Sequence, residues 1–420
     1  MERNLPFVGR VCNRIQIVVL WAALTWASTA VAGQWIVSPH GTITVQQALD
    51  RAYPGDTILI KPGVYHSGNV VVRIPITLLG EGYPVFDGDG KFEIFTIGAP
   101  NVTIQGLRII HSGHGSIEDV AGIKAIQSRN IKVIDNQFDH TFFGVYLANC
   151  RNALVKGNVL SSDPSAPEIG NGIHAWKCDS IHIQSNTVHG HRDGIYFEFV
   201  TNSLIEGNMS YNNMRYGLHF MFSHHDTYIS NTFRDNGAGV AVMYTQGVTM
   251  INNRFLDNRG SSSYGLLLKD IRDSFVERNT FSGNTTGVYM EGSSRCAFSG
   301  NTWHNNGWAV KIQANCDGNS FVSNNFLGNT FDIATNGSLV LNTLDHNYWD
   351  RYEGYDMNTD GIGDVPFHPV SLYSMIVEKM PSSVMLWRSF LVQLLDKTEK
   401  VIPSVTPVNM IDLKPSMKHL

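Results

Sequence analysis

An asparagine recurs every 22 or 23 residues through the middle of this chain, and this period constrains the fold more than any other feature. Two longer intervals, of 28 and 26 residues, contain insertions at Ser161–Gly170 and Arg259–Ser263. A large apolar residue stands two positions after nearly every one of these asparagines. The repeated residues are Asn136, Asn158, Asn186, Asn208, Asn231, Asn253, Asn279, Asn301, Asn324 and Asn347. A fixed period in this range predicts a solenoid, in which each repeat forms one coil.

Each repeat contains short apolar runs that alternate with period two. One run leads to the asparagine, as in Ile181–Asn186, and another opens with glycine, as in Gly194–Glu198. Such runs are too short for helices and predict strands. The Leu-x-x-Leu-x-Leu frame of leucine-rich repeats is missing. We therefore predict an all-β fold, a right-handed single-stranded parallel β-helix over residues 33–346.

Different segments are expected at the two ends of the solenoid. Thr44 and Gln47 form a capping-box pattern, which predicts a short helix over Val45–Ala52 that covers the open end. Residues 347–420 are predicted to form a C-terminal helical appendage. Within it, Ser371–Leu395 is apolar but too short and too polar to cross a bilayer. We expect this segment to contact a membrane-protein partner or the membrane surface through Met385, Trp387, Phe390 and Leu394.

The N-terminal residues 1–32 predict a secretory signal. Arginines precede the apolar stretch Ile15–Leu24, and small residues follow at Ala30–Ala32. A retained anchor is the alternative. The formal net charge of −5 and the lack of a basic stripe argue against nucleic-acid binding.

Two cysteines occupy the same position of neighbouring repeats, since Cys150 and Cys178 each lie eight residues before an asparagine of the series. Adjacent strands lie about 4.8 Å apart, within the Cα range that a disulfide accepts. In an oxidising compartment we expect a disulfide here, with a ladder of buried thiols as the alternative. Cys296 and Cys316 stand at different repeat positions, and we expect no bond between them.

Aligning the glycine-led strands gives two inward and two outward columns of side chains. The inward columns are apolar and form the predicted core. The outward columns present aromatic, histidine and methionine side chains where a plain solenoid would carry lysine, threonine and serine: Tyr146, His174, Tyr196, His219, Ala241, Leu267 and Tyr289, then Ala148, Trp176, Glu198, Met221, Met243, Lys269 and Glu291. Seven of the sixteen histidines fall between His174 and His225.

Imidazole and thioether groups together favour a soft ion, Cu(I) above all. His219, Met221, Met243, His174 and Glu198 are therefore the candidate copper ligands. The competing interpretation is a protein-docking patch that includes Trp176 and Tyr196, with methionine and histidine as ordinary surface residues. The two interpretations are compatible.

A carbohydrate-active enzyme is the alternative function, because parallel β-helices often act on polysaccharides. Such an enzyme would be a lyase, epimerase or hydrolase acting on an acidic polysaccharide. A glycosidase needs two carboxylates beside the scissile bond. Glu198, Asp193 and Asp226 are available, but no outward column presents stacked carboxylates.

The C-terminal region contains a calcium-loop pattern. Asp356, Asn358, Asp360 and Asp364 supply oxygen ligands at positions 1, 3, 5 and 9, and the carbonyl of Ile362 stands at position 7. The glutamate of position 12 is absent. The alternative is a connector held by Asx turns.

Three segments resemble the NosD family: Ala48–Ile58, Asn347–Asp356 and Asp360–Phe367. The likeness covers nearly the whole chain after the signal, and Asn347–Leu395 is its more specific part. The resemblance implies a non-enzymatic protein of the periplasm that serves in the maturation of nitrous oxide reductase. It implies attachment to an ABC transporter of the NosFY type and assembly of a copper–sulfur site in the apo-reductase, with copper supplied by a lipoprotein chaperone. No family motif extends to His219, Met221 or Met243, so their assignment rests on the residues alone.

Overall fold

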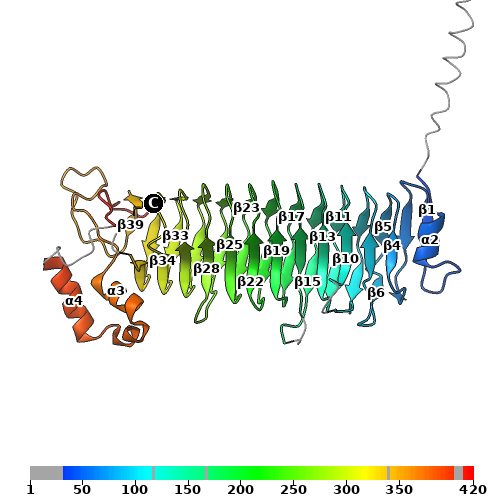
Figure 1. The fold of residues 1–420 in the computed structure, drawn as a ribbon, viewed down its shortest axis with the longest axis horizontal. Coiled ribbons are helices and arrows are strands. Elements are labelled where there is room, and N and C mark those ends of the chain that lie inside the picture. The colour runs from blue at the N-terminus through cyan, green and yellow to red at the C-terminus, as the bar shows by residue number, and fades with distance from the viewer. Residues whose placement is uncertain (1–31, 116–118, 166–168, 338–340, 402–409) are drawn as a thin grey trace, which may run out of the picture.

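The computed structural model describes residues 32–115, 119–165, 169–337, 341–401 and 410–420. Within these residues the chain winds into an elongated stack of three-stranded coils (Figure 1). All strand pairs between successive coils are parallel, and they form three long sheets that we name A, B and C. The predicted parallel β-helix is confirmed. The predicted signal sequence lies outside the described residues, apart from Ala32.

Sheet A has 14 strands: β1 (Gln34–Val37), β2 (Thr57–Ile60), β5 (Thr77–Gly80), β8 (Thr103–Gln105), β11 (Lys132–Ile134), β14 (Leu154–Lys156), β17 (His182–Gln184), β20 (Leu204–Glu206), β23 (Thr227–Ile229), β26 (Thr249–Ile251), β29 (Phe275–Glu277), β32 (Ala297–Ser299), β35 (Ser320–Val322) and β38 (Thr343–Asp345). Sheet B has 13: β3 (Val64–Tyr65), β6 (Val85–Asp87), β9 (Arg108–Ile110), β12 (Gln137–Asp139), β15 (Val159–Ser161), β18 (Thr187–His189), β21 (Met209–Tyr211), β24 (Thr232–Arg234), β27 (Arg254–Leu256), β30 (Thr280–Ser282), β33 (Thr302–His304), β36 (Asn325–Leu327) and β39 (Tyr348–Trp349). Sheet C has 12: β4 (Val70–Val72), β7 (Phe95–Ile97), β10 (Ala121–Ile126), β13 (Phe143–Ala148), β16 (Ile173–Trp176), β19 (Asp193–Glu198), β22 (Tyr216–Met221), β25 (Ala238–Met243), β28 (Tyr264–Lys269), β31 (Thr286–Glu291), β34 (Trp308–Ile312) and β37 (Phe331–Thr335).

The repeated asparagines lie at the turn between sheets A and B and form a continuous buried ladder. The side-chain oxygen of Asn301 accepts from the backbone N–H and the side-chain amide of Asn279, at 2.9 and 3.1 Å. The amide of Asn301 in turn donates to Asn324 and to the carbonyl of Val276. The residue before each asparagine, such as Ser323, has the left-handed backbone. The asparagines therefore form the hydrogen bonds of the ladder, and the residues before them adopt the left-handed conformation.

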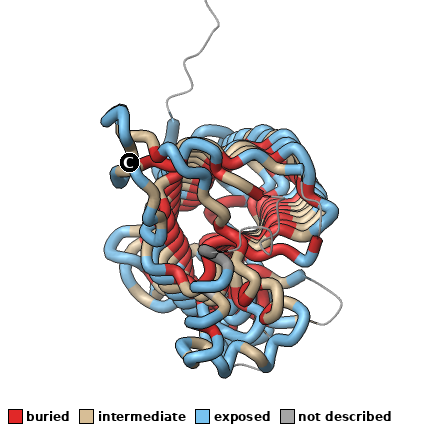
Figure 2. Tube along the Cα trace, turned by 90° about the vertical axis from the view of Figure 1, so that its left-hand side faces the viewer, coloured by how far each residue is buried: buried red, intermediate tan, exposed pale blue. Residues whose placement is uncertain are grey.

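The core consists of the inward columns predicted from the sequence, and Figure 2 shows buried residues along the inner walls of the coils. From Phe233 to Trp349, the residues two positions after the asparagines are aromatic, and their rings stack from coil to coil. Phe255 and Phe281 lie 4.6 Å apart between ring centroids, and Phe326 and Trp349 lie 4.1 Å apart. Burial and ring stacking thus repeat with the same period as the ladder.

Both ends of the solenoid are covered. Helix α2 (Val45–Arg51) begins at the predicted capping box, where Thr44 and Gln47 hydrogen-bond reciprocally, and it buries Val45, Ala48 and Leu49. At the other end, residues 410–420 return to the last coil. There Asp412 ends the ladder, because its Oδ2 accepts from the backbone and side chain of Asn347 and from Trp349 Nε1.

The predicted C-terminal helices are α3 (Leu372–Lys379), the 3₁₀ helix η1 (Pro381–Leu386) and α4 (Phe390–Val401), and they lie beside the last coils (Figure 1). Tyr373, Val377 and Val392 pack on Phe331 of β37. The ion pair of Lys311 and Glu378 joins α3 to β34 at 3.0 Å. No helix in the described part of the chain is long and apolar enough to cross a membrane. The predicted division at residues 346 and 347 stays a prediction, and β39 lies just beyond it.

Candidate metal and docking surface

The register of sheet C brings the candidate copper ligands together on its outer face. His174, Tyr196 and His219 occupy one position of three successive strands. Glu198, Met221 and Met243 occupy the next outward position, so that Met221 and Met243 are direct neighbours on β22 and β25. We call these six residues the Met–His face. The alignment made from the glycine-led repeats is confirmed.

Tyr196 connects the two columns of this face. Its hydroxyl lies 3.6 Å from Met221 Sδ and 3.4 Å from a carboxylate oxygen of Glu198. Burial, with the nearby charge of Glu198, raises the pKa of Tyr196 to about 12. The phenol therefore stays protonated and donates to one of these acceptors. Met221, Met243 and Glu198 are half-buried, so that the thioethers can be reached from solvent.

The predicted exposure of His219 is wrong, because its side chain points outward but is only 4% exposed. Its ring lies between those of Tyr196 and Tyr216, with centroids 5.0 and 4.7 Å away. Its Nδ1 is 3.6 Å from Asp193, which is fully buried. Neighbouring side chains of sheet C thus cover the imidazole. Neither ring nitrogen has a hydrogen-bond partner among the described residues.

Other members of the outward columns are also covered. Tyr146, Ala148, Ala241 and Leu267 are buried, against the expectation of an exposed face. Stacking between coils explains this, because large side chains in one column cover their neighbours. His174 lies between the rings of Tyr146 and Tyr196, at 4.8 and 4.7 Å. Burial, with the charge of Arg192, lowers the pKa of His174 to about 3, so that its imidazole is neutral. A neutral imidazole is the form that binds metal.

Beside the Met–His face lies an aromatic column that the sequence alignment missed, formed by Phe199, Phe222 and Tyr244. Each directly follows Glu198, Met221 or Met243, and the rings stack at 5.2 and 5.0 Å. The three residues are 44, 37 and 39% exposed. Their φ angles are +54°, +50° and +56°, a conformation that costs an aromatic residue energy. The same turn position is left-handed at Asn149, Lys177 and Asp270, so this conformation belongs to the turn of the coil. The exposed stack of rings makes the column a candidate binding surface. The sequence contains a signal for this column, namely an aromatic residue directly after the last outward residue of three successive strands.

The predicted docking residue Trp176 lies on the preceding strand, β16, directly beside Glu198. It is half-buried, and the Lys177 amine lies 4.4 Å from its ring. The thioethers, the aromatic column and Trp176 therefore adjoin one another over four coils.

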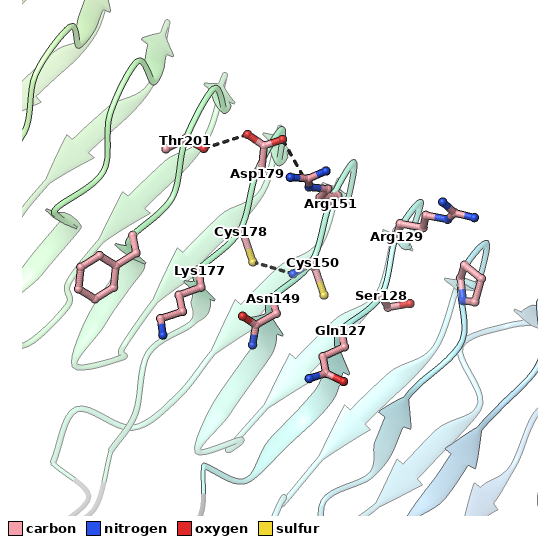
Figure 3. Close-up of a pocket in the computed structure, with 12 residues that line it drawn as sticks. Gln127, Ser128, Arg129, Asn149, Cys150, Arg151, Lys177, Cys178, Asp179 and Thr201 are labelled. Atoms are coloured by element: carbon pink, nitrogen blue, oxygen red, sulfur yellow. Dashed lines mark hydrogen bonds and ion pairs between the residues drawn. The ribbon is translucent and has the colours of Figure 1, made fainter.

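The predicted disulfide is contradicted, since Cys150 and Cys178 are free thiols (Figure 3). They stack as expected, but equivalent side chains of parallel coils point the same way rather than at each other. Each thiol interacts with the backbone instead. Cys178 Sγ accepts from the Cys150 N–H at 3.4 Å, and the two thiols donate to the carbonyls of Leu147 and Ala125. The alternative, a ladder of buried thiols, describes the site. Cys296 and Cys316 are also free, as expected.

The oxygen atoms of the predicted calcium loop are engaged by backbone amides. Asp356 accepts from the N–H of Gly361, Asp360 from that of Ile362 and Asp364 from that of Met357, at 2.7–2.8 Å. Asn358 accepts from the N–H of Asp360. These are the bonds of the alternative, an Asx-turn connector. Calcium binding stays a prediction.

The C-terminal helices expose an apolar surface, as the sequence predicted for Met385, Phe390 and Leu394. Met385 is 87% and Phe390 80% exposed, and Leu394 is exposed as well. Trp387 differs, because it packs inward on Phe331 and Tyr373. We define the C-terminal apolar surface as Met380, Met385, Leu386, Phe390, Leu391 and Leu394.

Comparisons with known proteins show a likeness to proteins named NosD. The family described as periplasmic copper-binding protein (NosD) matches residues 161–358. A Pseudomonas aeruginosa protein named probable ABC transporter binding protein NosD is 28% identical, covering 84% of this chain and 86% of its own length. A protein of the same name from Stutzerimonas stutzeri is 26% identical, with 85 and 86% covered. A Yersinia enterocolitica family 28 exopolygalacturonase shares the fold, with a TM-score of 0.55 at 11% identity over 75% of this chain and 79% of that one.

Proposed function

We propose that this chain, which is similar to the NosD proteins over most of its length, is a periplasmic accessory protein for the maturation of nitrous oxide reductase. In this proposal it docks on an ABC transporter and helps deliver copper to the apo-enzyme. The observation that carries the proposal is the pair of adjacent thioethers, Met221 and Met243, at the edge of an exposed aromatic column.

The chemistry of the Met–His face suits copper as a cargo rather than a permanent cofactor. Thioethers are soft donors that favour Cu(I) and bind zinc poorly. Two half-buried thioethers hold an ion weakly enough for it to be passed on. His174 and His219 stand behind them, and both rings contact Tyr196. A movement of the covering tyrosine rings would have to uncover these imidazoles before they could bind the ion. A copper-chaperone lipoprotein would deliver copper to the Met–His face. The apo-reductase would bind the aromatic column and receive the copper there.

Docking on the transporter is assigned to the C-terminal apolar surface. Among the described residues nothing covers its outward side chains, and a cluster of exposed apolar side chains is typical of a binding surface. Val392 on the opposite face of α4 is buried in a cluster with Tyr373 and Val377 of α3, so the helix presents its remaining apolar side chains in a fixed orientation.

A polysaccharide-acting enzyme stays the alternative. The buried Asp193, with Arg192, Arg215 and His219 within 4.0 Å, is the constellation that most resembles a catalytic group. Its carboxylate is fully buried, however, and cannot meet a polymer chain. The half-buried Glu198 has no second carboxylate beside it in its column. Copper handling is therefore the better-supported function.

The copper proposal predicts that replacing both thioethers abolishes one Cu(I) site. The variant Met221→Leu/Met243→Leu keeps similar apolar volume but removes the sulfur donors. Its affinity for Cu(I), measured by competition with a chromophoric chelator, should fall by about tenfold or more. The matched control is Met209→Leu/Met214→Leu, because these methionines are 42 and 48% exposed at other positions of the coils. If both variants bind Cu(I) with the same affinity and stoichiometry, Met221 and Met243 are not copper ligands.

The docking proposal predicts that charge on the C-terminal apolar surface prevents association with the transporter. Phe390→Glu/Leu394→Glu places two carboxylates where an apolar contact is expected, and exposure of both side chains leaves the fold intact. Co-purification with the transporter should be lost, whereas Phe275→Glu, at an exposed position on sheet A, should retain it. Point substitutions are preferable to removing the tail, because Asp412 completes the ladder. Association that survives in the double variant would place the contact on the solenoid.

A further inference from the structure

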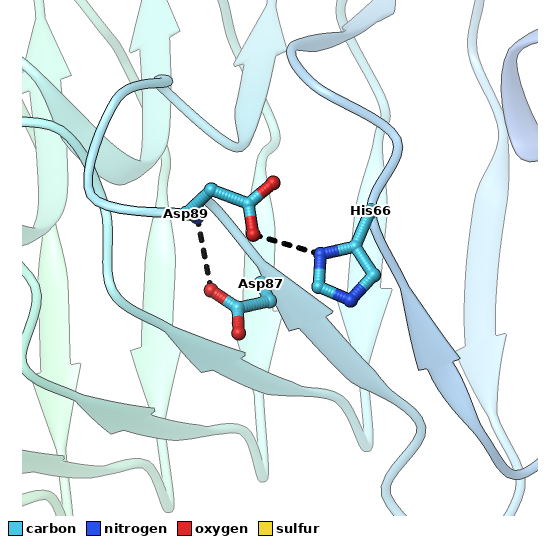
Figure 4. A group of neighbouring side chains, drawn as sticks. All are labelled: His66, Asp87 and Asp89. Carbon is cyan, nitrogen blue, oxygen red and sulfur yellow. Dashed lines mark hydrogen bonds and ion pairs between the residues drawn. The ribbon is translucent and has the colours of Figure 1, made fainter.

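A second group of potential metal ligands lies near the N-terminal end of the solenoid, far from the Met–His face. His66 follows β3, Asp87 ends β6, and Asp89 stands in the turn after it (Figure 4). The pairing of Tyr65 with Phe86 puts His66 and Asp87 at the same position of successive coils. The left-handed backbone of Asp89, with φ of +55°, is part of the turn that brings its carboxylate to His66. The register and one turn therefore gather three side chains distant from the repeated asparagines.

The distances in this group suit a single ion. His66 Nδ1 lies 2.8 Å from Asp89 Oδ1, and one ligand atom from each of the three residues lies within 4.8 Å of the others. A tetrahedral site with metal–ligand bonds of about 2.0–2.1 Å has ligand atoms about 3.3 Å apart. It is the only group of three or more His, Cys, Asp or Glu side chains with this spacing among the described residues. His111 is a candidate fourth ligand, since its Nδ1 is 3.2 Å from Asp87 Oδ1.

The charges of the group point the same way. Two carboxylates lie close together, and within the described chain neither forms an ion pair with lysine or arginine. Among the described residues their ion-pair partners are the two histidines, which are metal ligands when neutral. Imidazole and carboxylate ligands suit a divalent ion of intermediate hardness, whereas Cu(I) favours thioether sulfur. We propose that His66, Asp87 and Asp89, with His111 as the fourth ligand, bind a divalent transition-metal ion of the Zn²⁺ type. This site is independent of the copper face.

Calorimetric titration of the untagged full-length protein with Zn²⁺ alone tests the assignment. The wild type should bind Zn²⁺, and His66→Ala/His111→Ala should bind it about tenfold or more weakly. Asp89→Asn, which keeps the shape of the side chain, should weaken binding as well. Because these side chains lie at the surface, far-ultraviolet circular dichroism should be unchanged in all variants.

The matched control is His346→Ala. His346 Nδ1 forms a comparable pair with Asp345 at 2.9 Å, but no third ligand of this kind joins them in the described part of the chain. This variant should bind Zn²⁺ as the wild type does. The proposal is overturned if the wild type takes up no Zn²⁺ at micromolar concentration, or if loss of His66 and His111 leaves the affinity unchanged. Either result would leave the Cu(I) measurements on Met221 and Met243 unaffected.

Discussion

Replacing Asn301 with alanine is expected to lower the free energy of unfolding by roughly 3 kcal/mol, because it interrupts the ladder in a dry interior. Asn301 is fully buried, and its side-chain oxygen is the acceptor for the backbone N–H of Asn279. Alanine leaves that N–H without an acceptor and removes a donor from the carbonyl of Val276. An unsatisfied buried donor costs about 1–3 kcal/mol, and the lost bonds and the cavity add to this.

The measurement is urea unfolding followed by circular dichroism, with Asn315→Ala as the control. Asn315 is exposed, and its side-chain oxygen accepts from the N–H of Gly292 and, at 3.9 Å, from the Cys316 thiol. Its loss should cost well under 1 kcal/mol, by the usual effect of surface substitutions. Similar midpoints for the two variants would mean that the ladder marks the period of the coils without stabilising them.

The ladder also explains why so much of the fold could be predicted. Each coil of the series has a buried asparagine at the same turn. The spacing of these asparagines in the sequence therefore gives both the length of the repeat and the register of the strands. The inward columns, including Val240 and Met290, are fully buried as expected. The same alignment placed Met221 beside Met243. Parallel coils make these contacts a direct consequence of repeat position.

Depth of burial could not be read in the same way. Alternation tells which face a side chain points to, but not what covers it there. His219 points outward and is covered by Tyr196 and Tyr216, whose ring positions depend on side-chain packing. The cysteine pair shows the same limit, since spacing predicted the stacking but not the direction of the sulfur atoms.

Contacts outside the repeat were the least readable. The group around His66 lies in coils that precede the first asparagine of the series, where no marker aligned the sequence. The return of Asp412 to the last coil joins residues 65 positions apart through a segment without periodicity. In both places the interacting residues belong to turns or to the tail, whose course depends on tertiary packing.

Stability near neutral pH is expected to rise when Asp226 is replaced by asparagine. Asp226 is fully buried, and its Oδ1 accepts from the Ser203 N–H at 2.8 Å. Its Oδ2 has no hydrogen-bond partner within the described residues. Burial, with a smaller effect from the charge of Asp179, raises the pKa of Asp226 to about 8. The folded protein therefore keeps this proton up to about pH 8, whereas the unfolded chain releases it above about pH 4.

The sign of the pH dependence follows from this difference. Between about pH 4 and pH 8 the unfolded state binds fewer protons, so this group makes the folded state progressively less stable as the pH rises. The stability that depends on the proton of Asp226 is fully present below about pH 4 and is fully lost above about pH 8. Asparagine stays neutral throughout. Asp226→Asn should therefore match the wild type near pH 4 and exceed its free energy of unfolding by an amount on the order of 5 kcal/mol at pH 8.

The solenoid itself shows that asparagine fits this position. Asn319 stands at the equivalent place four coils further on, where its oxygen accepts from the Cys296 N–H and its amide donates to the Ser293 carbonyl. Urea unfolding at intervals from pH 4 to pH 8 measures the difference. Asp235→Asn is the control, because Asp235 is exposed and asparagine tolerates its left-handed backbone. A difference between Asp226→Asn and wild type that stays constant across this range would show that the buried carboxyl ionises near its ordinary pKa.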